Sequence, residues 1–399
     1  MNILIDENIP FAREAFASLG RVTTAAGRAI LPEMVHDVEI LVVRSITRVD
    51  ERLLAGSRVG FVATATIGTD HIDQAYLQQR GIGFSSAPGS NAESVAQYVT
   101  AALFEAAQTQ GRSLSEMSIG VVGAGNVGSR VARNARALGM KVMVNDPPRA
   151  RAEGGDGFVD LSEAVAADVV TLHVPLTRSG RDATAHLADA DFFGRMRPGS
   201  IFINTARGGV MDQEALAEAL KMGRPGLAVL DVWEDEPAVD PAMLALSRKD
   251  EEGAPAVLIA TPHIAGYSYD GKVRGTEMVY RAACDWLKTP AVWQASDVMP
   301  EAQVPRLNLT TEGHFALEIV GEAVRAVYDI RDDDTSFRAL SNVAASERAA
   351  FFDRLRKEYP VRREFSNTTV SLKPPYPAAA QALEGLGFCI APRSVATGR

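Results

Sequence analysis

The first ninety residues alternate short apolar runs with amphipathic stretches. The apolar runs have the length and composition of strands: "NILI" (2–5), "EILVV" (39–43), "VGFVATA" (59–65) and "IGFSS" (82–86). The stretches between them, such as "IPFAREAFASLG" and "HIDQAYLQQRG", have helical spacing. This alternation predicts a parallel sheet with crossover helices. A long helix is predicted next, over residues 90–108.

A second alternation begins at Ser118. It consists of short runs rich in Val, Ile and Leu: "SIGVVG", "KVMVND", "DVVTLHV", "SIFINTA", "GLAVLDVW" and "AVLIATP". Their apolar residues are continuous, as expected where helices cover both faces of a parallel sheet. The pattern predicts a doubly wound, Rossmann-type α/β sheet that extends to about residue 262.

The composition changes after an irregular, Pro-rich segment at 289–307. Helices are predicted at 312–328 and around 343–358, followed by the mixed segment "PVRREFSNTTVSLKPP". We expect this tail to form a small α+β domain. The segment "SRKDEEGAPA" (247–256), by contrast, has the composition of an enlarged surface loop.

Composition limits the classes of protein to consider. A chain of 399 residues is too long for one ordinary core, so two or three domains are expected. The net charge of −9, without a long Lys/Arg run, argues against nucleic-acid binding, and no apolar run is long enough to span a membrane. Two cysteines, Cys284 and Cys389, fit a reducing compartment, and the N-terminus is acidic where a signal peptide is basic. We therefore predict a cytoplasmic protein.

A glycine-rich loop follows the first strand of the second alternation. Gly123, Gly125 and Gly128 form G-x-G-x-x-G between an apolar strand and an amphipathic helix. That context is the one required of a dinucleotide-binding loop: the first glycine permits the turn, the second the approach of the pyrophosphate, and the third close helix packing. The simpler alternative is a strand–turn–helix without a ligand.

Asp146 ends the next strand, in "NDPP". A carboxylate there accepts hydrogen bonds from the adenosine ribose hydroxyls and repels a 2′-phosphate, which favours NAD over NADP. Against this, Arg149 lies three residues further on and could meet such a phosphate.

Candidate catalytic residues follow three later strands. Arg207 lies in "INTARGGVMD", Asp231 and Glu236 in "VLDVWEDEP", and His263 in "TPHIAGY". Ligands of open α/β sheets bind at the carboxyl ends of the strands. There a guanidinium can hold a substrate carboxylate, and a carboxylate can favour the protonated form of a neighbouring imidazole. The imidazole can then exchange a proton with a substrate hydroxyl.

Each of these residues has a simpler interpretation. Arg207 could be a solvated loop residue, "EDEP" an acidic surface turn, and His263 a core histidine at the end of a strand. Glu234 or Asp235 could also take the place of Glu236. The occurrence of all three groups at strand ends, after a dinucleotide-binding loop, favours the catalytic interpretation.

Residues 1–290 resemble the D-isomer-specific 2-hydroxyacid dehydrogenase family. The segments that carry the resemblance occur in order: "GAGNVGSRVARNARALGMKV", "LHVPLT", "INTARGGVMD", "DVWEDEP" and "TPHIAG". The resemblance implies that Arg207, Glu236 and His263 form the catalytic set, with NAD as cofactor and no metal. It also implies a discontinuous, flavodoxin-like substrate-binding domain (1–92 and 263–290) into which an NAD-binding domain (93–262) is inserted.

A narrower resemblance is to the members of this family that act in vitamin B6 biosynthesis. It rests on five segments: "VRSITRV" (43–49), "ATATIGTDHID" (63–73), "SAPGSNAESVAQYV" (86–99), "HIAGYSYDGKVRGTEMVY" (263–280) and "FDRLRKEYPVRREFS" (352–366). It implies NAD-dependent oxidation of 4-phospho-D-erythronate at C2, to 2-oxo-3-hydroxy-4-phosphobutanoate. It also implies a homodimer formed through a C-terminal dimerisation domain at 291–399.

The same resemblance assigns further residues. Ser45, Thr66 and Tyr267 would contact the substrate. Cofactor contacts would come from the backbone of Asn126 and Val127 at the pyrophosphate, from Asp231 at the nicotinamide carboxamide, and from Gly266.

Two alternatives to this function stay open. One is a related dehydrogenase that acts on 3-phosphoglycerate or hydroxypyruvate, and the other is an NAD(H)-sensing binding protein of the same fold. The tail also contains clustered arginines, predicted to form a solvated basic face: Arg354, Arg356, Arg362 and Arg363. A further hypothesis is that a tail arginine, Arg348 among the candidates, reaches the active site of a neighbouring subunit.

Overall fold

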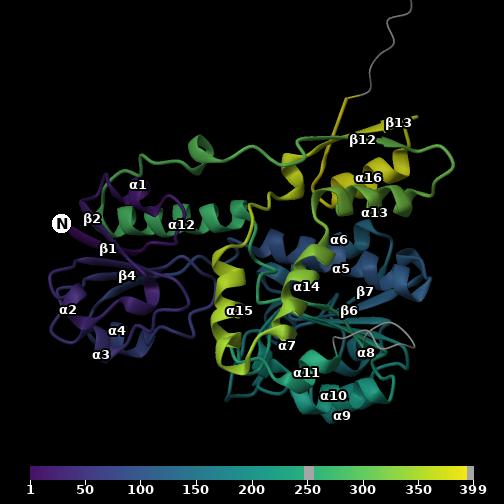
Figure 1. Cartoon of the computed structure of the whole chain (residues 1–399), viewed down its shortest axis with the longest axis horizontal. Helices are drawn as coiled ribbons and strands as arrows, with labels where there is room; N and C mark the ends of the chain where they lie inside the picture. Colours follow the sequence, from purple (N-terminus) through teal and green to yellow (C-terminus); the bar gives the residue numbers. More distant parts are fainter. Residues whose placement is uncertain (247–255, 393–399) are drawn as a thin grey trace, which may run out of the picture. The chain divides into compact units, whose positions relative to one another are not determined.

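The computed structural model describes residues 1–246 and 256–392, and the chain divides into two compact units (Figure 1). Unit 1 combines Met1–Glu93 with Tyr267–Glu301, and unit 2 combines Ser94–Gly266 with the residues from Ala302 onwards. Apart from Ala256, the segment predicted as a surface loop lies outside the described residues.

Unit 1 contains a five-stranded parallel sheet in the order β2-β1-β3-β4-β5. Its strands are β1 (Asn2–Asp6), β2 (Arg21–Ala25), β3 (Ile40–Val43), β4 (Phe61–Thr64) and β5 (Gly83–Ser85). Its helices are α1 (Ala12–Phe16), α2 (Pro32–Val35), α3 (Glu51–Leu54), α4 (Gln74–Gln79) and α12 (Tyr269–Leu287). This strand order is that of flavodoxin-like folds, as the sequence implied.

Helices cover both faces of this sheet. Strand β3 shows the consequence, because Ile40 and Val42 belong to the core cluster that contains Phe16 and Tyr280, from α1 and α12. Leu41 and Val43 belong to the opposite cluster, which is filled from α2, α3 and α4. Successive side chains of a strand point to opposite faces, so a strand buried on both faces needs the continuous apolar run that the sequence has.

Unit 2 contains a six-stranded parallel sheet in the order β11-β10-β9-β8-β6-β7, which confirms the predicted Rossmann-type sheet. Its strands are β6 (Ser118–Val122), β7 (Lys141–Asn145), β8 (Val169–Leu172), β9 (Ile201–Asn204), β10 (Leu227–Leu230) and β11 (Val257–Ala260). Strand β6 pairs with β7 on one side and with β8 on the other. Successive strands are therefore added on one side of β6 and then on its other side. Such a reversal marks the ligand-binding position in doubly wound folds.

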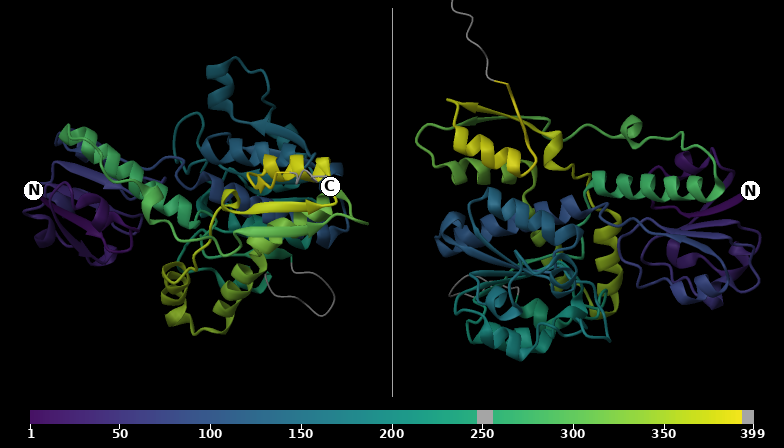
Figure 2. Two further views of the ribbon diagram at one scale, coloured as in Figure 1. Left: turned by 90° about the horizontal axis from the view of Figure 1, so that it is seen from above. Right: turned by 180° about the vertical axis from the view of Figure 1, so that it is seen from behind.

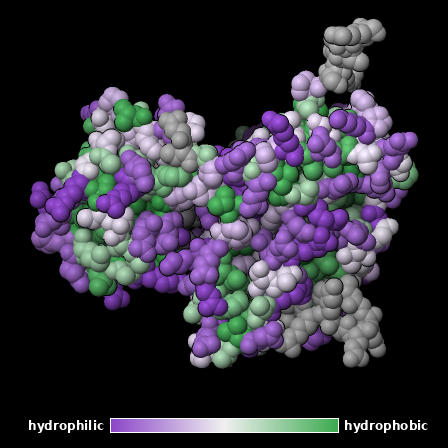
Figure 3. Space-filling model, turned by 45° about the horizontal axis from the view of Figure 1, so that its top comes forward, coloured by the Kyte–Doolittle hydropathy of each residue, from purple (hydrophilic) through white to green (hydrophobic). Residues whose placement is uncertain are grey.

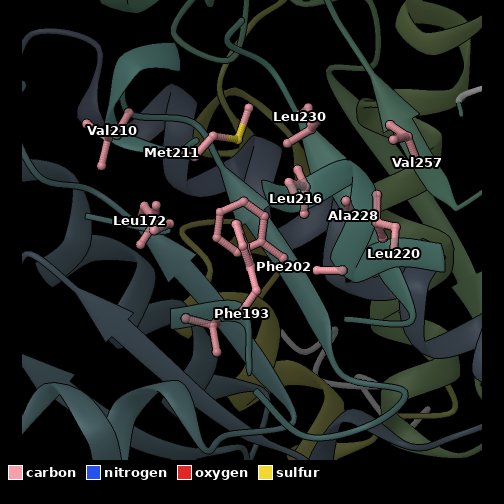
Figure 4. Packing of buried hydrophobic residues seen from close by; sticks show 14 of the residues in the cluster. Leu172, Phe193, Phe202, Val210, Met211, Leu216, Leu220, Ala228, Leu230 and Val257 are labelled. Atoms are coloured by element: carbon pink, nitrogen blue, oxygen red, sulfur yellow. The ribbon is translucent and has the colours of Figure 1, made fainter. Parts of the chain in front are cut away.

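The helices of this part of unit 2 pack on both faces of its sheet (Figures 1 and 2). They are α5 (Ala92–Gln110, which begins two residues before the unit does), α6 (Asn126–Ala137), α7 (Pro147–Glu153), α8 (Leu161–Val165), α9 (Ala190–Arg195), α10 (Gln213–Lys221) and α11 (Pro241–Leu246). Aspartates accept the first free N–H groups of several of them, as N-caps: Asp146 for α7, Asp189 for α9 and Asp212 for α10. On one face, the rings of Phe193 and Phe202 meet edge to face, 5.1 Å apart (Figure 4).

Up to residue 392, the tail adds a three-stranded parallel sheet and four α-helices to unit 2. The strands are β12 (Arg306–Thr310), β13 (Thr369–Lys373) and β14 (Cys389–Ile390), and the helices are α13 (Ala316–Val327), α14 (Ile330–Arg338), α15 (Arg348–Lys357) and α16 (Pro377–Gly385). Helix α16 packs against α6 and α13 (Figure 2), and α14 packs against β11. A separate dimerisation domain over 291–399 stays a prediction, since the structure groups the tail with the Rossmann-type sheet.

Aromatic rings join this tail to the core of unit 2. Trp233, after β10, stacks on Phe337 of α14 with the ring centres 5.2 Å apart, and Phe337 meets Phe352 of α15 edge to face at 6.0 Å. All three side chains are buried. The tail therefore completes the core of unit 2 instead of covering only itself.

On the face that Figure 3 shows, hydrophobic residues are scattered among hydrophilic ones. Within the described ranges, no helix is long and apolar enough to cross a membrane. The predicted solvated basic face is wrong for Arg362, which is only 6% exposed.

Candidate active site and cofactor loop

The turn between β6 and α6 contains three glycines whose surroundings differ. Gly123 has φ +89°, which favours glycine, and a side chain at Gly128 would lie 1.8 Å from the Gly123 carbonyl oxygen. A side chain at Gly125 would meet nothing within 4 Å, so open space lies in front of that backbone. Turn, close packing and free approach are the three properties that a dinucleotide-binding loop needs.

The N-terminus of α6 lies at this turn. The helix begins at Asn126, with Val127 second, and the first N–H groups of any helix have no partner within the helix. A pyrophosphate suits that position, because it can accept these hydrogen bonds and is favoured by the helix dipole. The contacts of Asn126 and Val127 with the cofactor stay predictions.

Asp146 is fixed at the end of β7 by two backbone hydrogen bonds. Its Oδ2 accepts the N–H of Ala124, in the glycine loop, at 2.8 Å, and its Oδ1 accepts the N–H of Arg149 at 3.0 Å. The Arg149 guanidinium pairs with Glu153 at 2.7 and 2.9 Å and donates to the Ala124 carbonyl oxygen at 2.5 Å. Because this arginine is already engaged within the unit, the one feature that pointed to NADP loses weight.

Asp146→Ala is expected to weaken NAD binding and to relax discrimination against NADP. The substitution removes the acceptor for the ribose hydroxyls and the charge that repels a 2′-phosphate. Fluorescence titration with NADH and NADPH measures both effects. An unchanged preference would remove Asp146 from the ribose site.

His263 and Glu236 form a hydrogen-bonded pair just beyond the strand ends. The His263 Nδ1 and the Glu236 Oε1 are 2.5 Å apart, and both side chains are about a quarter exposed (28% and 24%). Burial acts to raise the pKa of Glu236, but the charge and hydrogen bond of His263, together with the charge of Arg356, hold this pKa below its ordinary value. Glu236 is therefore ionised at neutral pH and orients the ring so that Nε2 is left for a substrate.

The structure separates Glu236 from its two neighbours in "EDEP". Glu234 Oε1 lies 2.7 Å from Nε2 of a different histidine, His186. Asp235 accepts a backbone hydrogen bond from Ala238 through its carbonyl oxygen, in the turn that follows. Of the three acidic residues, Glu236 is the one hydrogen-bonded to His263.

Asp231 forms hydrogen bonds with the backbone of the segment that contains His263. It is 1% exposed, and its two carboxylate oxygens accept the N–H groups of Ile264 at 2.7 Å and Ala265 at 3.0 Å, with the Thr261 hydroxyl at 2.7 Å. Burial raises the pKa of Asp231, which the charge of His263 opposes. His263 has φ +58°, a left-handed conformation that costs an L-residue about 1–2 kcal/mol, so this segment needs such support.

Arg207 lies just after β9, and β9 is the neighbour of β10 in the sheet. Its Nη1 donates to the Ala206 carbonyl oxygen at 2.7 Å, and its side chain is half-buried. A side chain at Gly208 would lie 1.9 Å from the Trp233 carbonyl oxygen, so the loop of Arg207 packs directly on the loop of Glu236. Strands β9, β10 and β11 are neighbours, and their carboxyl ends carry Arg207, Glu236 and His263 in turn.

The predicted substrate residues Ser45, Thr66 and Tyr267 belong to unit 1. Ser45 is exposed beyond β3, and Thr66 follows the adjacent strand β4, with its hydroxyl 2.8 Å from that of Thr64. The Tyr267 ring lies under Lys272 Nζ, 4.3 Å from the ring centre. Their contact with a substrate stays a prediction, as does that of Gly266 with the cofactor.

His173, which the sequence analysis did not single out, lies beside the cofactor loop. It follows β8, with ring nitrogens 3.0 Å from the Thr171 hydroxyl and 3.4 Å from the Thr205 hydroxyl. Burial lowers the pKa of His173 to about 3, so its ring is neutral. Its backbone would lie 2.8 Å from a side chain at Gly123, which places it against the cofactor loop. The sequence contains a sign of this position, because "LHVPLT" has a single histidine directly after an apolar strand.

Glu236→Gln is expected to lower kcat. The glutamine keeps a hydrogen-bond acceptor for the His263 ring but lacks the charge that stabilises the cation formed when the ring takes the substrate proton. Steady-state kinetics measures this loss, and a kcat close to wild type would exclude Glu236 as the functional partner of His263.

Comparison with known proteins supports the family resemblance that the sequence shows. Residues 87–265 match the family described as D-isomer specific 2-hydroxyacid dehydrogenase, NAD binding domain, and residues 298–387 match a domain family of unknown function. Among solved structures, the D-lactate dehydrogenase of Aquifex aeolicus, complexed with NAD and lactic acid, aligns with a TM-score of 0.61 and 28% identity. The alignment covers 72% of this chain and 96% of that one.

Curated relatives match over nearly the whole chain. The erythronate-4-phosphate dehydrogenase of Chromohalobacter salexigens is 46% identical over 97% of this chain and 98% of its own length. The enzyme of the same name from Salinibacter ruber is 47% identical over 93% and 94%. The chain is thus an NAD-dependent dehydrogenase, and it belongs to the erythronate-4-phosphate dehydrogenases within the D-isomer-specific 2-hydroxyacid dehydrogenase family.

Proposed function

We propose that this chain oxidises 4-phospho-D-erythronate at C2 to 2-oxo-3-hydroxy-4-phosphobutanoate, with NAD as the hydride acceptor, in vitamin B6 biosynthesis. The observation that carries the chemistry is the His263–Glu236 pair, which lies at the strand ends of the same unit as the glycine loop. The name of the close relatives supports the choice of substrate.

Each catalytic residue has a distinct task in this proposal. The Arg207 guanidinium holds the substrate carboxylate by two hydrogen bonds. Nε2 of His263 takes the proton of the C2 hydroxyl, and the adjacent Glu236 carboxylate stabilises the imidazolium that forms. When bound, NAD supplies the acceptor for the C2 hydride. Asp231 keeps the His263 backbone in place and, by family resemblance, meets the nicotinamide carboxamide.

Formation of NADH with a panel of 2-hydroxy acids tests this proposal. The value of kcat/KM should be highest for 4-phospho-D-erythronate. The matched competitors are 3-phosphoglycerate and D-glycerate, which share the carboxylate and the D-hydroxyl. Preference for 3-phosphoglycerate would support the related dehydrogenase. Tight NADH binding without turnover of any 2-hydroxy acid would support a sensor instead, although both alternatives are less consistent with the relatives' shared name.

We also propose that the protein is a homodimer assembled through its tail and located in the cytoplasm, where its two free cysteines would stay reduced. Two-fold dimers are the commonest soluble oligomers. The tail presents an exposed aromatic ring, Phe315, with 77% of its surface accessible, at the start of α13.

Light scattering is expected to give twice the chain mass of 42.7 kDa. Phe315→Ser should shift the mass towards the monomer at low protein concentration, since it removes exposed apolar surface from the tail. Met222→Ser is the matched control, because Met222 is equally exposed (75%) but lies outside the tail. A monomeric native chain would exclude the dimer, and equal effects of the two variants would exclude this part of the tail as the interface.

A further inference from the structure

Arg362 lies between α15 and β13, and its guanidinium is buried within unit 2. Its Nη2 donates to the carbonyl oxygen of Ala265 at 2.8 Å and also to the hydroxyl of Ser94. The Ser94 hydroxyl donates in turn to the same Ala265 carbonyl oxygen, at 2.8 Å. One backbone carbonyl therefore accepts hydrogen bonds from two buried side chains, one of which comes from the tail.

Ala265 is two residues after His263, in the segment that Asp231 holds from the other side. The N–H groups of Ile264 and Ala265 donate to the Asp231 carboxylate, and the N–H of His263 donates to the Asp231 carbonyl oxygen at 2.7 Å. Arg362 supplies the opposing constraint, on the carbonyl side of the same short segment. A left-handed residue such as His263 keeps its conformation only where its surroundings determine it.

The tail contains the groups that make a buried guanidinium tolerable. The Arg362 guanidinium lies over the ring of Tyr328, 4.1 Å from its centre, which gives a cation–π contact. The Asp333 carboxylate, whose charge interacts with that of Arg362, accepts the hydroxyls of Tyr328 at 2.7 Å and Tyr359 at 2.9 Å. Burial raises the pKa of Tyr328 well above its ordinary value, so its ring stays neutral beneath the cation.

This arrangement still leaves the guanidinium incompletely satisfied. Its Nε and Nη1 are buried and have no hydrogen-bond partner among the described residues. Burying a charged group with unmet donors is unfavourable. The specific gain from an arginine is the pair of directed hydrogen bonds at Ser94 and Ala265.

We propose that Arg362 is a positioning residue of the dehydrogenase site: from the tail, it holds the Ala265 carbonyl and thereby fixes the segment 263–266 that carries His263. The inference rests on the proposed function, because it concerns the same His263. It gives the tail a part in turnover within its own subunit, apart from any role in dimerisation. The mechanism is geometric, since Arg362 acts through the backbone: it donates to the Ala265 carbonyl, whereas His263 and Glu236 bond to each other.

Arg362→Lys and Arg362→Ala in the full chain test this proposal, with Arg363→Ala as the matched control. Arg363 is the next residue, and its Nη2 donates to Asn367 within the tail. In the Arg362 variants, kcat should fall by about tenfold or more, because small displacements of a catalytic group can cost up to ~100-fold. The dissociation constant for NADH should change much less, and free guanidinium should restore part of the kcat that the alanine variant loses.

Amide hydrogen exchange of the peptide that contains 263–266 gives a second readout that needs no substrate. Exchange at Ile264 and Ala265 should become faster in both Arg362 variants and stay close to wild type in Arg363→Ala. If the native chain fails to oxidise 4-phosphoerythronate, the proposed function fails, while faster exchange would still support the positioning role.

Two results would overturn the inference. One is wild-type exchange and wild-type kcat in folded Arg362 variants. The other is an equal loss in Arg363→Ala, which would show a general weakening of the tail. If Arg362→Ala does not fold, Ser94→Ala provides the decisive variant: it removes one of the two hydrogen bonds to the Ala265 carbonyl, and unchanged exchange at 263–266 would then count against the proposal.

Discussion

His263→Ala is expected to lose about a hundred- to ten-thousand-fold in kcat while NADH still binds with nearly native affinity. General acid–base groups contribute rate factors of this size. In His263, Nδ1 is hydrogen-bonded to Glu236 and Nε2 is left for the substrate. The cofactor loop between β6 and α6 does not involve this side chain, so binding should survive. Steady-state kinetics and fluorescence titration separate the two effects.

His263→Asn serves as a control for the backbone. Asparagine tolerates the left-handed conformation that His263 adopts at φ +58°, so this variant removes the base without straining the segment. Both variants should be similarly slow. Turnover within a few-fold of wild type in either one would remove His263 from the mechanism.

A chain that ends at Glu301 is expected not to fold into a stable, NAD-binding protein. It loses Phe337 and Phe352, which belong to the same core cluster as Phe202 and Trp233. Each large-to-small change of a buried phenylalanine costs about 3–5 kcal/mol, and removal of the whole tail costs more. Since a domain is stable by only about 5–15 kcal/mol, this loss is enough to unfold unit 2.

Thermal unfolding followed by circular dichroism measures the expected loss. A truncation limited to residues after Ala391, whose N–H donates to the Val370 carbonyl oxygen at 2.9 Å, is the matched control and should unfold like the full chain. The prediction fails if the chain that ends at Glu301 unfolds cooperatively and binds NADH. Such a result would support the predicted separate domain of the tail.

The sequence predicted both large sheets because their strands are continuous apolar runs covered on two faces. It also predicted the glycine loop, since backbone geometry at Gly123 and close packing at Gly128 leave no choice of residue. The choice of Glu236, instead of Glu234, as the partner of His263 came from the family resemblance and could not be made from the residues alone. The three acidic residues of "EDEP" are chemically equivalent in a sequence, and only the turn geometry selects one.

The tail was harder to interpret, because its buried groups are charged. Helix α14 reads as "IRDDDTSFR", which has the composition of an exposed loop. In the structure, Asp334 accepts the N–H of Ala260 at 2.8 Å and an N–H of Arg338 at 2.6 Å, and it is 9% exposed. A carboxylate that satisfies the N–H of an edge strand is favourable only once that strand is in place. The prediction that Arg362 is solvated was wrong for the same reason: the groups that accept its hydrogen bonds are distant in sequence and are brought to it only by the fold.

The order in which the ribosome makes this chain conflicts with the order in which its cores close. Unit 1 needs α12, which is synthesised after the whole Rossmann-type sheet, and the core of unit 2 needs Phe352. At about 5–20 residues per second, the nascent chain carries incomplete hydrophobic cores for many seconds, until its last helices emerge. During that time the parallel sheets are open to contact with other nascent chains. We therefore expect the yield of soluble enzyme to depend more strongly on chaperones and growth temperature than that of a dehydrogenase without the tail.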